Sequence, residues 1–99
     1  MFYVYILRSK KDGKLYVGCT SNLENRIGRH EKGFVISTRS RLPIELIYKE
    51  TFEDKSSAFQ RERFLKSLWG AREKRKILKK FLFDQSLASW VELAKSSEE

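Results

Sequence analysis

Two short apolar runs separated by a turn signal open this chain and constrain its fold most strongly. The first run, Phe2 to Arg8, is rich in β-branched and aromatic residues, which favour a buried strand. The segment from Ser9 to Gly13 ends in Asp-Gly, a dipeptide that supplies the positive φ of a tight hairpin turn. Lys14 to Thr20 then has the composition of a returning strand. We therefore expect a β-hairpin whose tyrosines come close together, on a face that depends on the register.

A helix, a loop and a third strand are predicted to follow the hairpin. Ser21 or Asn22 can cap the helix, which Gly33 ends. Residues 34–42 have no clear period and are predicted to form a surface loop with a basic tip. Residues 44–52 then have the pattern of a strand.

Helices are expected in the rest of the chain. Asp54 or Ser56 caps a helix that runs to about Trp69 and Gly70, and a further helix occupies roughly residues 72–83. The apolar face of that further helix consists of Ile77, Leu78, Phe81 and Leu82. The order strand-strand-helix-strand-helix-helix predicts an α+β fold in which an antiparallel or mixed sheet packs against helices.

The last segment is predicted to be a short helix and a tail. Ser86 can cap this helix, and Trp90 and Leu93 are expected to dock on the core. The tail from Lys95 to Glu99 is expected to be frayed.

The charge of the chain indicates a polyanionic partner. Its 99 residues include 21 Lys and Arg but 13 Asp and Glu, which gives a net charge of +8. Nine of the basic residues lie in residues 61–80, beside two acids. A solvated helix surface is the alternative interpretation. A membrane surface is disfavoured, because the basic segment lacks the continuous apolar face of an interfacial helix.

Cysteine and histidine are too few for several kinds of site. The chain has one cysteine and one histidine, which excludes an intramolecular disulfide and the Cys/His clusters of zinc modules. Met1 leads directly into an apolar run of strand length in place of a leader sequence. We therefore expect a reducing, cytoplasmic location.

One carboxylate falls where an apolar residue is expected. Ala58, Leu65 and Trp69 would share one helix face, and Glu62 lies in the middle of it. A carboxylate buried there alone would cost several kcal/mol, so it must be paired or bound to a metal. Pairing with an arginine at the edge of the core and coordination of Mg²⁺ both remain open.

The first helix has a similar anomaly. Arg26 and His30 lie on the same face as Leu23 and Ile27. Guanidinium groups bind phosphate through two hydrogen bonds, which favours an anion site over a structural histidine. In the hairpin, Gly18 marks either a close approach by a ligand or a bulge.

Taken in order, these residues resemble a known pattern. Tyr3-Val4-Tyr5, about ten residues before Tyr16-Val17-Gly18, is similar to the paired motif of the GIY-YIG nuclease superfamily. The similarity is greatest to its small single-domain members, the UPF0213 or YhbQ-like group. Residues 22–30, 38–39, 43–50 and 58–66 resemble the further helices, loop and strand of that group.

The resemblance spans about residues 2–82 and implies both a fold and a chemistry. The fold is a three-stranded antiparallel sheet flanked by helices. Residues 1–83 are assigned to the catalytic domain, and residues 84–99 to a helix and frayed tail that pack on the same domain. The chemistry is metal-dependent endonuclease or exonuclease hydrolysis of phosphodiester bonds in nucleic acid.

Roles for individual residues also come from the resemblance. Tyr5 or Tyr16 would orient or deprotonate the attacking water, Arg26 would stabilise phosphate charge and His30 would assist nearby. Glu62 would hold one Mg²⁺ or Mn²⁺. Residues expected to contact nucleic acid are Tyr3, Gly18, Thr38, Arg39, Arg41, Arg61 and Lys66.

The partner is expected to be nucleic acid, with DNA favoured over RNA and no membrane involved. A non-catalytic nucleic-acid-binding module of the same fold is the alternative. The superfamily usually adds a separate DNA-binding domain, which has no counterpart in this chain. Affinity would then depend on residues 61–80 or on a recruiting protein partner.

Overall fold

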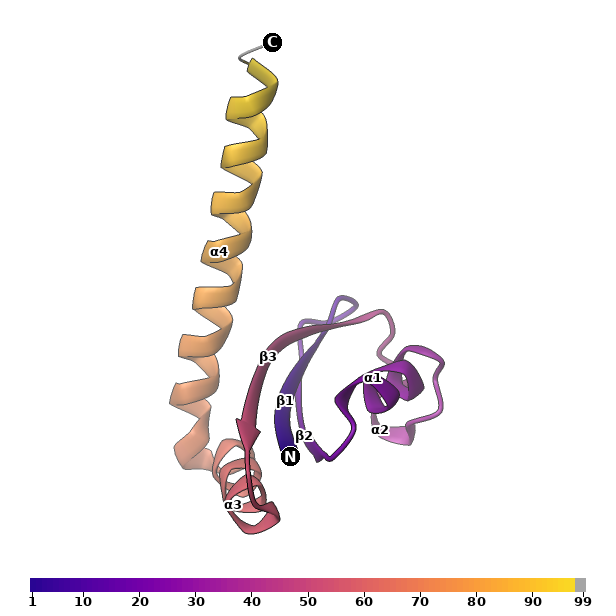
Figure 1. Ribbon diagram of the computed structural model, residues 1–99. Helices are drawn as coiled ribbons and strands as arrows, with labels where there is room; N and C mark the ends of the chain where they lie inside the picture. The colour runs from indigo at the N-terminus through magenta and orange to yellow at the C-terminus, as the bar shows by residue number, and fades with distance from the viewer. Residues whose placement is uncertain (98–99) are drawn as a thin grey trace.

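A three-stranded antiparallel sheet forms the centre of the molecule (Figure 1). The computed structural model describes the backbone of residues 1–97 and the side chains of residues 1–87. Strand β1 (Phe2–Ser9) lies between β2 (Leu15–Thr20) and β3 (Ile44–Phe52) and pairs antiparallel with both. The predicted α+β class and the three-stranded antiparallel sheet are confirmed.

The register of the hairpin decides which tyrosines share a face. Gly13 has a φ of +77°, as the Asp-Gly turn requires. Tyr5 lies opposite Gly18, and Leu7 lies opposite Tyr16. Residues directly opposite one another in an antiparallel pair point to the same side, as do alternate residues of one strand. Tyr5, Gly18 and Tyr16 therefore occupy one face of the sheet.

The hydrophobic core lies on the other face, under helices α3 (Lys55–Lys66) and α4 (Ala71–Ser97). Its fully or almost fully buried members are Val4, Ile6, Ile47, Ala58 and Leu65. Helix α4 packs against this cluster through three residues at helical spacing, Ile77, Leu78 and Phe81. This face supplies most of the apolar burial, so the tyrosine face is left to carry polar groups.

Helices α1 (Leu23–Glu31) and α2 (Ile36–Arg39) lie on the tyrosine side (Figure 1). Asn22 caps α1 by accepting a hydrogen bond from the backbone of Asn25 at 3.0 Å. The prediction of an irregular loop over residues 34–42 is wrong for its middle part. Four residues form α2, because the amide of Arg39 donates to the carbonyl of Val35 at 2.9 Å.

Helix α3 ends earlier than predicted. Ser67 has an extended backbone, and its hydroxyl donates to the carbonyl of Phe64 at 2.6 Å. A short 3₁₀ helix, η1 (Leu68–Gly70), follows, and its Trp69 is 85% exposed. The prediction that Trp69 continues the buried face of α3 is therefore wrong, because Ser67 turns the chain first.

Helix α4 replaces the two helices predicted after residue 71. It is continuous through Ser86, since no glycine or proline interrupts residues 71–97. The C-terminal half of α4 extends past the sheet (Figure 1). The expected docking of Trp90 and Leu93 concerns side chains outside the described residues. None of the helices described here is apolar enough over a sufficient length to span a membrane.

Candidate active site

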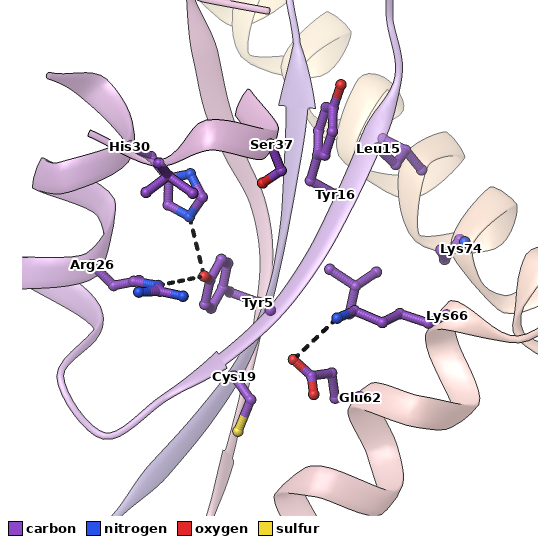
Figure 2. A pocket seen from close by; sticks show the side chains of 13 residues that line it. Tyr5, Leu15, Tyr16, Cys19, Arg26, His30, Ser37, Glu62, Lys66 and Lys74 are labelled. Atoms are coloured by element: carbon purple, nitrogen blue, oxygen red, sulfur yellow. Dashed lines mark hydrogen bonds and ion pairs between the residues drawn. The ribbon is translucent and has the colours of Figure 1, made fainter. Parts of the chain in front are cut away.

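A pocket of about 420 Å³ opens beside β2, one of the two edge strands of the sheet (Figure 2). Helices α1 and α2 contribute to it from the tyrosine face, and α3 and α4 contribute from the core face. Its lining contains all five residues predicted to be catalytic or metal-binding, namely Tyr5, Tyr16, Arg26, His30 and Glu62. The fold thus brings together residues that lie as many as 57 positions apart in the sequence.

The ring of Tyr5 reaches this pocket because Gly18 leaves room for it. A Cβ atom at Gly18 would overlap the ring carbons and the hydroxyl oxygen of Tyr5. The ring therefore lies against the backbone of the neighbouring strand. The pairing of β1 with β2 has no bulge at Gly18, and the group that lies against this glycine is the Tyr5 ring. The approach of a ligand to Gly18 stays a prediction.

A chain of hydrogen bonds runs through the buried side of the pocket. Arg26 Nε donates to Tyr5 Oη at 3.3 Å, and Tyr5 Oη lies 3.2 Å from His30 Nε2. On the far side of the imidazole, His30 Nδ1 lies 2.7 Å from Thr38 Oγ1. Tyr5, His30 and Thr38 are 2%, 4% and 0% exposed. The chain therefore links α1, β1 and α2 in an environment with little water.

Burial also sets the charge of His30. Desolvation lowers the pKa of His30 below its ordinary value, and the nearby guanidinium groups of Arg26 and Arg29 lower it further. The imidazole is therefore neutral at neutral pH. A neutral imidazole has one nitrogen that can accept a proton.

The two predicted tyrosines have different surroundings. The hydroxyl of Tyr5 contacts both Arg26 and His30, as drawn in Figure 2. The hydroxyl of Tyr16 points away from that group in Figure 2. Tyr5 is therefore the tyrosine that is coupled to a base.

Glu62 is the one carboxylate in the lining of the pocket, and its side chain is 17% exposed. Its Oε2 lies 3.6 Å from Lys66 Nζ, one turn later on α3. The carboxylate thus pairs with a lysine and not with the arginine that was considered. With Arg26, Lys66 and Lys74 as cations and His30 neutral, the lining has an excess of positive charge, as a phosphate site requires.

The pocket suits a divalent cation of the magnesium kind. Among the described side chains, no group of three or more His, Cys, Asp or Glu could enclose a metal ion. Mg²⁺ is commonly held by one or two carboxylates together with water and substrate phosphate, which a single Glu62 can satisfy. Cys19 also lines the pocket, but burial and the Glu62 carboxylate raise the pKa of its thiol, so it is protonated and a poor ligand.

Several residues predicted to contact nucleic acid lie elsewhere. Arg61 donates to Glu50 at 3.0 Å and to Glu73 at 3.4 Å, so it links α3 to β3 and α4. Arg41 pairs with Asp12 of the hairpin turn at 3.0 Å. Of the other residues predicted to contact nucleic acid, Gly18 and Lys66 line the pocket. Tyr3 lines a second hollow beside α1, and Arg39 is exposed. Thr38 is buried against His30.

Lys74 and Ser37 also line the pocket. The sequence indicated Lys74 only as part of the basic segment 61–80 and did not place either residue at the catalytic site. A signal for Lys74 was present, because it precedes Ile77 and Leu78 by three and four residues and so shares their face. A lysine on an apolar face is the same kind of anomaly as Glu62. No comparable signal exists for Ser37, which lies in a segment without a period.

Comparison with known proteins places the chain in a family. Residues 1–76 match the model of the GIY-YIG catalytic domain. A UPF0213 protein of Natronomonas pharaonis is 46% identical over 74% of this chain and 86% of its own length. One of Clostridium perfringens is 49% identical over 69% of this chain and 73% of its own. The solution NMR structure of a UPF0213 protein of Bacillus halodurans superposes with a TM-score of 0.51 at 36% identity, over 80% of this chain and 84% of that one.

Proposed function

Because the chain belongs to the GIY-YIG family, a family of nucleases, we propose that it hydrolyses phosphodiester bonds in nucleic acid with the help of a divalent cation. The observation that carries this proposal is the hydrogen-bonded group of Tyr5, Arg26 and His30 in one pocket with Glu62. These residues supply a proton acceptor, a phosphate ligand and a metal ligand around one space.

The proton path follows from the hydrogen-bond chain. Tyr5 Oη accepts from Arg26 Nε, so its own hydrogen is available to His30 Nε2. This proposal assigns the remaining hydrogen of the neutral imidazole to Nδ1, which then donates to Thr38 Oγ1. As a water molecule attacks phosphorus, its proton passes to Tyr5 Oη and the tyrosine proton passes to His30. The bond from phosphorus to the leaving sugar oxygen then breaks, and that oxygen takes a proton from solvent.

The cations of the pocket act on the phosphate. Arg26 is placed to donate to a phosphate oxygen while its Nε bonds Tyr5, which fixes the phosphate beside the proton acceptor. Lys66 and Lys74 add positive charge from α3 and α4. A metal ion bound by Glu62 would polarise the phosphate and neutralise developing charge. The metal is Mg²⁺ or Mn²⁺ in this proposal.

Thr38 has a positioning role in this proposal and does not contact nucleic acid. Its hydroxyl holds His30 Nδ1, which leaves Nε2 facing Tyr5. The expected outcome of Thr38→Val is a loss of cutting with little loss of affinity, because the imidazole is no longer held in its orientation.

Cleavage of labelled DNA and RNA tests the proposal directly. Single-stranded, duplex and branched substrates are incubated with Mg²⁺, with Mn²⁺ or with EDTA. The wild type should cut at least one substrate with a metal and none with EDTA. Glu62→Gln and Arg26→Ala should lower the rate by roughly 100-fold or more, since each removes stabilisation of the transition state. Glu53→Gln, at an exposed position outside the pocket, should keep the wild-type rate.

Folding is measured on the same variants. An i,i+4 ion pair on a helix contributes about 0.5 kcal/mol. Glutamine also keeps the size of the Glu62 side chain, so Glu62→Gln should unfold in urea almost as the wild type does. Unfolding of Glu62→Gln at much lower urea would instead assign this residue a structural role. Binding of nucleic acid without cleavage under either metal would support a non-catalytic binding module.

A further inference from the structure

Two large apolar side chains lie in solvent next to the pocket. Phe34 is 66% exposed and Ile36 is 82% exposed. Val35 and Ser37, which alternate with them along the chain, line the pocket. The segment therefore presents one set of side chains to the pocket and the other set to the surface immediately beside it.

The backbone of Phe34 is fixed to the helix that carries Arg26 and His30. The amide of Gly33 donates to the carbonyl of His30 at 3.1 Å, and the amide of Phe34 donates to that of Arg29 at 2.9 Å. With Gly33 at a φ of +79°, these bonds form a Schellman motif. In this motif the apolar residue commonly packs back on its own helix, whereas Phe34 stays exposed beside the charged Arg29. Helix capping alone therefore does not account for a phenylalanine here.

The far end of the segment is anchored as well. The Thr38 hydroxyl bonds His30 Nδ1 at 2.7 Å, and the Thr38 amide donates to Val35 at 3.2 Å. Residues 34–38 are thus tied to α1 at both ends. Phe34 and Ile36 accordingly keep a fixed position relative to the phosphate ligand Arg26.

The surroundings of this pair are positively charged. From Lys32 to Pro43 the chain contains no acidic residue, and Lys32 and Arg39 are exposed. An anionic partner with an apolar surface fits this chemistry. A nucleotide meets both conditions, because its phosphate would enter the pocket while its base reaches the rim. Bases inside a duplex have both faces covered by neighbours, so the base that can stack on a side chain is an unpaired one.

We propose that Phe34 and Ile36 form a platform for the unpaired base next to the bound phosphodiester. The inference rests on the proposed function and deepens it by naming the substrate class. The preferred substrate has a single-stranded segment at the site of cleavage, and its base sequence matters little, because every base offers an aromatic face.

Binding in EDTA tests the platform separately from cleavage. The probes are a short single-stranded oligonucleotide that contains 2-aminopurine, and the same strand in a duplex. Replacing both Phe34 and Ile36 by alanine should weaken binding of the single strand roughly fivefold or more, the loss expected for one stacked base. Duplex binding should change much less, and the quenching of 2-aminopurine by the protein should disappear. Phe83→Ala on α4 is the matched control, because Phe83 is 63% exposed and lines no part of the pocket. It should change neither affinity.

Other results would overturn the platform. Unchanged affinity in the double variant, or an equal loss for single strand and duplex, would exclude base stacking. A change of oligomeric state in sedimentation would assign the pair to contact between copies of the chain, and lost binding of anionic vesicles with unchanged nucleic-acid binding would assign it to a lipid surface.

The proposed function and the platform fail in distinguishable ways. If the wild type binds single strands through Phe34 but cuts nothing with any metal, the proposed function alone fails. If the double variant binds and cuts as the wild type does, the platform alone fails. If the wild type binds no nucleic acid, both fail.

Discussion

His30 is the residue whose burial has the clearest thermodynamic consequence. Its pKa is lowered from 6.5 in the folded protein, mainly by desolvation. Below pH 6.5 the unfolded chain therefore binds a proton that the folded protein does not, and the free energy of unfolding decreases as the pH falls toward the folded-state pKa. Well above pH 6.5 both states are neutral at this position, so the full stability is present there.

Urea unfolding at neutral and mildly acidic pH measures this effect. The wild type should lose stability between about pH 6.5 and pH 5, the range below the ordinary pKa of histidine. His30→Gln should lose much less, because His30 is the only histidine in the chain. The carboxyls of Asp12 and Asp54 have pKa values lowered from 3.8 and titrate below this range. An equal loss in His30→Gln would contradict the assignment.

Candidate site residues could be predicted from the sequence where a polar side chain interrupts an apolar helix face. Arg26, His30 and Glu62 could be identified because each places a polar group on an apolar helix face. The contact between Thr38 and His30 could not be predicted, because Thr38 lies in a segment whose apolar residues follow neither helix nor strand spacing. The ion pair of Arg61 was also unpredictable, since its carboxylate partners come from β3 and α4 and meet it only in the folded chain.

The pairing of strands β1 and β2 contains a tight packing constraint. The Tyr5 ring crosses β2 at Gly18, and any Cβ there would push the ring away from Arg26 and His30. Gly18→Ala should therefore lower stability by about 1–3 kcal/mol, as overpacking does, and lower the cleavage rate by a larger factor than stability explains. Urea unfolding and cleavage rates on one preparation measure both quantities.

Gly28→Ala is the matched control for this substitution. Gly28 lies in α1, and a Cβ there meets no atom within 4 Å. Alanine is favoured over glycine in a helix by about 1 kcal/mol, so Gly28→Ala should keep or raise stability and keep activity. Loss of activity in both variants would mean that the Tyr5 ring is not the reason for Gly18.

The ends of helices and strands could be predicted where a turn residue or a helix-capping residue marks them in the sequence. The hairpin, the Asn22 cap and the start of α3 at Asp54 follow from turn and cap residues. The end of α3 could not be predicted in this way. The Ser67 hydroxyl ends the helix by donating to the carbonyl of Phe64, and no glycine or proline marks that position in the sequence. The break expected at Ser86 failed for a related reason, since a residue that can cap a helix can also lie inside one.

The whole molecule carries its positive charge unevenly. Four basic residues of α4 surround a shallow hollow of about 580 Å³, which faces away from the core: Arg72, Arg75, Lys76 and Lys79. We call these four residues the basic ridge. If the basic ridge contacts the phosphates of a nucleic acid, the logarithm of the binding constant should fall linearly with the logarithm of the salt concentration, with a slope of about one for each phosphate contact.

A pair of charge-matched variants tests the basic ridge. Replacing both Arg75 and Lys79 by glutamine should weaken binding and flatten the salt dependence. Replacing both Lys11 and Lys14 by glutamine removes the same charge from the exposed hairpin turn and should have a smaller effect. Equal effects in titrations over a range of salt would show that net charge alone attracts nucleic acid.

The place of the pocket at β2 has a consequence for how the molecule can associate. In the described part of the chain β2 pairs with β1 alone, so its outer side offers unpaired backbone groups. Side chains from both faces of the sheet reach the pocket around that outer side. If the pocket binds the scissile phosphate as proposed, a strand from another molecule that paired with β2 would occupy the space that this phosphate needs. On that proposal, a peptide that extends the sheet at β2 would act as a competitive inhibitor of cleavage.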